Sequence, residues 1–104
     1  MSISEAKQLL KQLQRLLEKQ LELARRSKIS EVENLVEQTG ELAKKIGEAG
    51  IFESPEIKEL RARIETLYEQ LCLSLSAYKG IINDELGQVR RGRKIINAYR
   101  LNAR

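Results

Sequence analysis

The sequence predicts an all-α protein, built as an elongated antiparallel helical hairpin or a three-helix bundle with coiled-coil-like packing. Its 104 residues are rich in Leu, Glu, Lys, Arg, Ala and Gln, which is the composition of long helices. Apolar residues recur at steps of three and four along most of the chain, which is the period of helices with one buried face. A chain of this length predicts a single helical domain over residues 1–104.

The first helix is expected over residues 2–27. Its apolar residues would form one stripe: Ala6, Leu10, Leu13, Leu17, Leu21 and Ala24. Ser2 and Glu5 have the spacing of a capping box, in which each side chain satisfies a backbone N–H of the first turn. Both observations favour a helix that starts at the beginning of the chain.

A second helix is expected over residues 30–47. Ser30 and Glu33 repeat the capping-box spacing, and the apolar pattern pauses just before them. The sequence leaves open whether this segment continues the first helix with a kink or begins a new one. Gly47 and Gly50 offer the left-handed conformation that ends helices.

The third expected helix covers residues 55–100 and begins at the clearest boundary in the chain. Ser54 suits the N-cap, Pro55 the first helical position and Glu56 the acidic first turn. The apolar residues that continue the pattern are Ile57, Leu60, Ile64, Leu67, Leu71, Leu75, Tyr78, Ile82, Leu86, Val89 and Ile96. If unbroken, this helix would extend about 70 Å and would return antiparallel to the preceding segments.

Missing residue types exclude several functions. The chain has no His, which removes the usual general base, the Ser-His and Cys-His dyads and the commonest zinc ligand. No nucleophile, base and orienting group can be assembled from the other residues, so no catalytic residue, metal ligand or cofactor is expected. The single cysteine, Cys72, lies between Leu71 and Leu73 and is expected to be a buried, reduced thiol of a cytoplasmic protein. No signal peptide or membrane-spanning stretch is expected.

Positive charge is concentrated at the C-terminal end. Residues 88–104 contain six Arg or Lys and no acidic residue, whereas the rest of the chain has 13 basic and 15 acidic residues. This basic end predicts a surface for an acidic partner, or a solvated helix end whose cations complement the helix dipole. Tyr99 lies within it and is the tyrosine that we expect to contact a partner.

The residues alone leave three classes of binding or structural protein open. An amphipathic helical bundle can hold a partner helix, or it can self-associate as a structural coiled-coil subunit, for example a homodimer. A nucleic-acid-associated helical adaptor is the least favoured, because no base-stacking aromatic platform accompanies the basic end. No small-molecule substrate is expected.

Two segments of the chain resemble the flagellar type III export chaperones of the FlgN/FliT kind. One is Glu33-Asn34-Leu35-Val36-Glu37-Gln38 in the second helix. The other ends the last helix, and its most specific part is Arg91-Gly92-Arg93-Lys94, followed after three residues by Ala98-Tyr99. The likeness covers nearly the whole chain in pattern and about a dozen residues in motif.

The resemblance implies a small cytoplasmic chaperone without a cofactor. Such a protein holds helical segments of flagellar hook-associated or cap proteins and delivers them to the type III export apparatus, where an export-gate component is a further partner. By resemblance, the last helix supplies the partner contacts. The residues expected to make them are an apolar strip, a cationic rim and an aromatic anchor: Val89 and Ile96, then Arg90, Arg91, Arg93 and Lys94, then Tyr99. Ile82 and Leu86 are expected to pack on the first helix instead.

Overall fold

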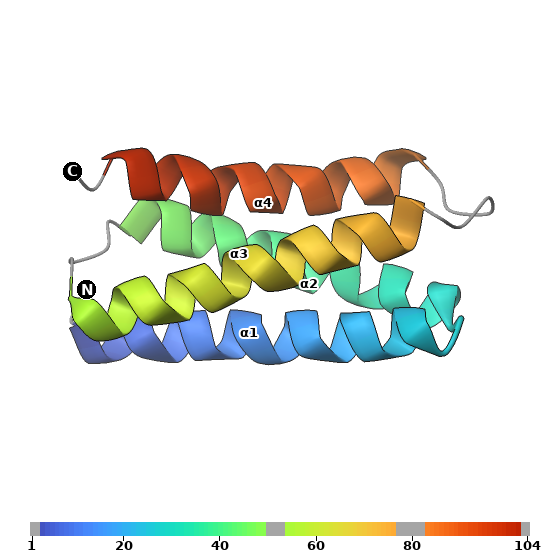
Figure 1. Cartoon of the computed structure of the whole chain (residues 1–104). Coiled ribbons are helices and arrows are strands. Elements are labelled where there is room, and N and C mark those ends of the chain that lie inside the picture. Colours follow the sequence, from blue (N-terminus) through green and yellow to red (C-terminus); the bar gives the residue numbers. More distant parts are fainter. Residues whose placement is uncertain (1–2, 50–53, 77–82, 103–104) are drawn as a thin grey trace.

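Four α-helices make up the described chain (Figure 1). The computed structural model describes residues 3–49, 54–76 and 83–102. The helices are α1 (Ile3–Arg25), α2 (Ile29–Ala49), α3 (Pro55–Ser76) and α4 (Asn83–Asn102), and no strand occurs among these residues. The prediction of an all-α protein is therefore confirmed.

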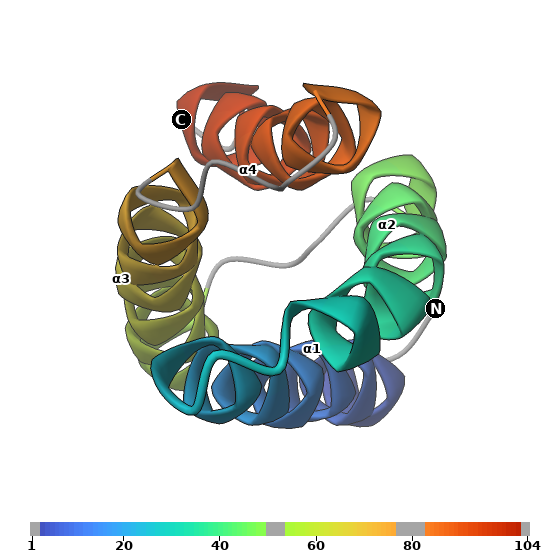
Figure 2. The same cartoon turned by 90° about the vertical axis from the view of Figure 1, so that its right-hand side faces the viewer.

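The four helices form a closed ring when the bundle is viewed end-on (Figure 2). α1 packs against α2 and α3, and α4 packs against the same two helices from the opposite side. α1 and α3 run in one direction and α2 and α4 in the other (Figure 1). An ion pair between Lys7 and Glu56 joins α1 and α3 near the end at which both helices begin.

The prediction of one long helix over residues 55–100 is wrong, and with it the description as a hairpin or three-helix bundle. α3 ends at Ser76 and α4 begins at Asn83, so the bundle is only 40 Å long. Folding α4 back against α2 and α3 buries Val89 and Ile96, which a straight helix would have carried beyond its neighbours. The sequence does contain a start signal at this point, because Asn83 is a good N-cap type and Asp84 and Glu85 follow it.

The core is one continuous cluster with residues from all four helices. Its buried members are Ala6, Leu10, Leu13, Leu17, Ala24, Val32, Val36, Ala43, Ile46, Ile57, Ile64, Tyr68, Leu71, Leu75, Val89 and Ile96. Every residue of the stripe expected in the first helix is buried, Leu21 included. The helical period was thus sufficient to identify the inward faces.

The turn between α1 and α2 settles the choice that the sequence left open: two helices, not one with a kink. Ser27 adopts a left-handed conformation with φ 60°. The backbone N–H of Lys28 donates to the carbonyl of Leu23 (2.9 Å), and that of Ser27 donates to the carbonyl of Ala24 (3.0 Å). These two bonds form a Schellman motif, which here uses a serine at the position that usually holds glycine.

A buried polar pair joins α1 to α2 within the core. Gln20 is fully buried, and its amide donates to the backbone carbonyl of Val32 (3.3 Å). The Thr39 hydroxyl lies 2.7 Å from the amide oxygen of Gln20 and 2.9 Å from the carbonyl of Leu35. Since these side chains find partners on the facing helix, they fix the alignment of α1 with α2.

Candidate partner-binding site

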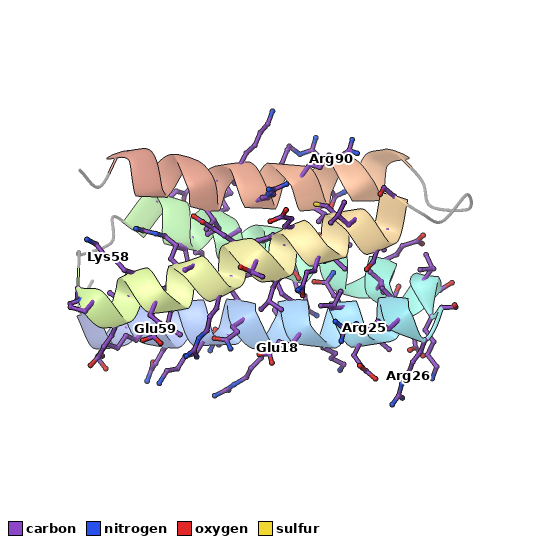
Figure 3. The ribbon with its side chains drawn as sticks, in the orientation of Figure 1. Glu18, Arg25, Arg26, Lys58, Glu59 and Arg90 are labelled. Carbon is purple, nitrogen blue, oxygen red and sulfur yellow. The ribbon has the colours of Figure 1, made fainter. Side chains whose placement is uncertain are left out.

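The basic segment of α4, which we define as residues 89–99, has one inward face and two flanks. Val89, Gly92 and Ile96 point into the bundle and are buried. The cations divide between the two flanks of the helix, because Arg90, Arg93 and Lys94 line a groove beside α3 while Arg91 lines one beside α2. Figure 3 shows Arg90 on α4, on the side of the bundle opposite α1.

The first of these surfaces is the α3/α4 groove, of about 450 Å³. Its lining residues are Glu69, Cys72, Leu73 and Ser76 of α3 with Arg90, Arg93 and Lys94 of α4. The α3 residues follow the i, i+3, i+4, i+7 spacing and the α4 residues follow i, i+3, i+4, so each helix contributes one face. The two rows form the walls of a groove about 10 Å long, at ~1.5 Å of helix rise per residue.

Leu73 is the apolar feature of this groove. Its side chain is 66% exposed, and it is the one large apolar residue in the described part of the chain that is exposed to this degree. The reason is its place on α3: Leu71 and Leu75 belong to the buried stripe, and Leu73 lies between them, about 200° around the helix at ~100° per residue. The groove therefore has an apolar residue that is left exposed in the described part of the chain.

The electrostatic character of the α3/α4 groove is cationic. Three cations face one carboxylate, Glu69. No ion pair joins Arg90, Arg93 or Lys94 to a carboxylate among the described residues. Burial raises the pKa of the Cys72 thiol, and the guanidinium groups of Arg93 and Arg90, which line the same groove, oppose that increase. Cys72 is half-buried, so the prediction of a buried thiol is wrong in degree.

The second surface is the α2/α4 groove, of about 340 Å³. It is lined by Glu37, Gly40, Glu41 and Lys44 of α2 with Gln88, Arg91, Gly92 and Ile95 of α4. Two carboxylates face two cations here, so the charges balance. The charges of the lining residues thus sum to zero in the α2/α4 groove, whereas cations are in excess in the α3/α4 groove.

Close packing on both flanks holds α4 in position. A Cβ atom at Gly92 would lie 2.7 Å from the Tyr68 hydroxyl of α3, and one at Gly47 would lie 2.7 Å from Cγ2 of Ile95. Both glycines therefore allow an approach that a larger residue would prevent. The Tyr68 hydroxyl is buried and has no hydrogen-bond partner in the described part of the chain; burial, with a smaller contribution from Cys72, raises the pKa of Tyr68 well above its usual range.

The structure brings together only some of the residues that the sequence singled out. Val89 is 4% exposed and Ile96 is 1% exposed, so a partner can reach them only if α4 separates from its neighbours. The side chain of Tyr99 lies outside the described residues, as do Ile82 and the side chain of Leu86. The four cations stand on two flanks, not on one rim.

Sequence reasoning missed the α3 wall of the groove: Glu69, Cys72, Leu73 and Ser76. One signal was present, because Leu73 departs from the apolar stripe that runs through Leu71 and Leu75. An apolar residue outside the buried stripe either packs against a further helix or is exposed to solvent. The sequence does not distinguish these two possibilities, because the outcome depends on how α4 packs.

The described residues contain neither a cluster of metal-binding side chains nor a membrane-spanning helix. No three His, Cys, Asp or Glu side chains gather there as ligands. None of the helices, searched over the same residues, is long and apolar enough to cross a membrane.

The fold and the groove define a class of helical binding protein: a four-helix bundle with a cationic groove that contains a partly exposed apolar side chain. The family model described as "Flagellar protein FliT" matches residues 7–101, which is nearly the whole chain. The chain therefore belongs to the FliT family, which is a family of flagellar export chaperones and not of enzymes. This confirms the resemblance to the FlgN/FliT chaperones. Searches of the curated proteins and of the solved structures found no match.

Proposed function

We propose that this protein is a cytoplasmic chaperone that binds helical segments of flagellar hook-associated or cap proteins and delivers them to the type III export apparatus. The observation that carries the proposal is the cationic flank of α4 beside Leu73, the one large apolar side chain that is exposed among the described residues. A protein that binds an amphipathic helix needs such a combination of an uncovered apolar side chain and a polar rim. Membership of the FliT family supports the flagellar assignment.

The residues proposed to contact the partner are those of the basic segment. Arg90, Arg93 and Lys94 form the rim next to α3, and Arg91 extends the positive surface toward α2. Tyr99, further along α4, is proposed as an aromatic anchor. Val89 and Ile96 are proposed to contribute indirectly, because their buried side chains hold α4 in position against the bundle.

Binding to purified flagellar proteins tests the proposal. The full chain is mixed with a hook-associated protein or the cap protein from the same organism, and the complex is measured by calorimetry and by gel filtration. Cells that lack the chain are assayed in parallel for secretion of the same proteins. We expect a complex and a loss of secretion that the wild-type chain restores.

Two results would contradict the proposal. One is normal secretion without the chain together with no binding to any of these proteins. The other is self-association of the chain that buries the basic segment at the concentrations used for binding, which would favour a structural coiled-coil subunit.

A further inference from the structure

We propose that the α3/α4 groove binds one short amphipathic helix that covers Leu73 with apolar side chains and places acidic side chains against Arg90, Arg93 and Lys94. This inference rests on the proposed function and names the chemistry of the partner segment. It also names the face of the bundle, which neither the family nor the sequence identifies.

The shape of the groove selects a helix as its occupant. Glu69, Leu73 and Ser76 lie on one face of α3, and Arg90 and Lys94 lie on one face of α4, so the walls are two adjacent helices. A third helix laid between two helices presents side chains at i, i+3, i+4 and i+7, which matches the spacing on both walls. The α3 wall extends about two turns and the α4 wall about one, so the contact needs only a short segment of the partner.

Charge selects an acidic partner. The groove contributes three cations and one carboxylate, and no described residue pairs with the three cations. A segment with two or more carboxylates on one flank would complete these pairs, whereas a basic segment would be repelled. Arg93 is the best placed of the three, because it is the partly buried one and lines the groove together with Cys72, whereas Arg90 and Lys94 are exposed.

The two grooves beside α4 can be ranked by the same criteria. The α2/α4 groove is smaller, its charges balance and it contains no exposed large apolar side chain. Only the α3/α4 groove leaves both charge and apolar surface unmatched. Nucleic acid fits it poorly, since the described lining residues include no aromatic side chain for base stacking but do include Glu69 and Leu73.

Cys72 provides a direct reporter of occupancy, because it lines the groove and is the single cysteine of the chain. The experiment measures the rate at which iodoacetamide alkylates the full chain, by mass spectrometry, with and without a synthetic helix. The probe is a peptide of roughly 14 residues, about four turns, with Leu at every third or fourth position and Glu beside them. The control peptide has Lys in place of each Glu.

We expect the Glu peptide to slow alkylation about tenfold at a concentration ten times its Kd, by mass action, and the Lys peptide to leave the rate unchanged. Arg93→Glu should weaken binding of the Glu peptide about tenfold, because an attractive pair becomes repulsive. Lys19→Glu is the matched control, with the same change in charge at an exposed position of α1 outside both grooves, and should change affinity less than about twofold. Each variant is compared with itself without peptide, since Arg93 also affects the reactivity of the thiol.

Several outcomes would overturn the inference. Equal protection by the Lys peptide, or equal loss of affinity in the Lys19→Glu and Arg93→Glu variants, would show that charge at this groove does not select the partner. Protection that rises with the concentration of the chain alone would identify a second copy as the occupant. Protection by a single-stranded oligonucleotide and not by the peptide would identify nucleic acid.

The same variants separate this inference from the proposed function. If the wild-type chain and Arg93→Glu bind a flagellar hook-associated or cap protein equally, the chaperone function stands and the groove assignment is wrong. If the Glu peptide protects Cys72 but no flagellar protein binds the wild-type chain, the groove assignment stands and the chaperone function is wrong.

Discussion

The two helical pairs of this bundle, α1 with α2 and α3 with α4, are built differently at their interfaces. Between α1 and α2, the buried Gln20 and Thr39 bond to each other, and a Schellman motif at Ser27 closes the turn. Between α3 and α4, the buried Tyr68 hydroxyl has no partner in the described chain, and a groove remains between the outer faces of the two helices. Leu73 lies exposed in that groove.

The difference shows where the molecule has interactions left to make. In the α1–α2 pair, the buried polar side chains are hydrogen-bonded and the turn has a defined conformation. We therefore call this pair the frame, because such interactions hold two helices in one arrangement. In the α3–α4 pair, Arg90, Arg93 and Lys94 form no ion pair with the described residues and Leu73 is exposed, which is the kind of surface that a partner can cover. Membership of an export-chaperone family is consistent with a division into a frame and a binding face.

The largest expected effect comes from a charge inside the α3–α4 pair. Ile96→Asp places a carboxylate where the side chain is 1% exposed, and we expect a loss of more than about 4 kcal/mol of stability. Gln88→Asp adds the same charge at an exposed position of α4 and should cost less than about 1 kcal/mol. Urea denaturation followed by circular dichroism measures both. An Ile96→Asp variant as stable as the control would mean that α4 is not packed in the core.

The next effect concerns the polar pair of the frame. Gln20→Ala leaves a cavity and removes the partner of Thr39, so we expect a loss of about 2–3 kcal/mol. Glu18→Ala, at an exposed position of the same helix, is the control and should change stability by less than about 0.5 kcal/mol. Equal denaturation midpoints for the two variants would remove the proposed distinction between the frame and the binding face.

A pair of glycines tests how closely α3 and α4 approach each other. Gly92→Ala should destabilise the protein by about 1–2 kcal/mol, because the added methyl would lie 2.7 Å from the Tyr68 hydroxyl. Gly40→Ala meets nothing within 4 Å and should stabilise α2 by about 0.5–1 kcal/mol. Adding Tyr68→Phe to Gly92→Ala removes the closest atom and should recover part of the loss. Thermal denaturation would contradict this packing if both alanine variants gained stability.

The smallest effect is at the turn of the frame. Ser27 has φ 60°, which glycine adopts without the steric penalty of a side chain. Ser27→Gly and Ser27→Ala both remove the hydroxyl. The difference between their stabilities therefore reports the cost of a side chain in the left-handed backbone conformation. We expect the glycine variant to be about 1 kcal/mol more stable than the alanine variant by chemical denaturation. The reverse order would show that the left-handed conformation is not populated.

The sequence predicted the inward faces well but missed the number of helices. Residues such as Leu10, Leu17 and Ile64 are buried as expected, because the helical period is a local property. The break after Ser76 was not predicted. Apolar residues at steps of three and four are compatible both with one continuous helix and with two helices that pack against each other. Asn83 with the two acids after it was the available signal.

The site was predictable in composition but not in arrangement. The basic count of residues 88–104 indicated a surface for an acidic partner. The division of the cations between two flanks depends on how α4 is rotated against α2 and α3, and that rotation follows from close packing at Gly92 and Gly47. Exposure of Leu73 likewise depends on which face of α3 its neighbours leave uncovered.

The central claim is that the α3–α4 pair binds the partner while the α1–α2 pair serves as a frame. Hydrogen–deuterium exchange of the full chain, alone and with a bound flagellar hook-associated or cap protein, tests this claim most directly. We predict that binding protects residues 69–76 of α3 and 90–94 of α4 and leaves exchange in α1 and α2 unchanged. Protection confined to α1 and α2 would contradict the account.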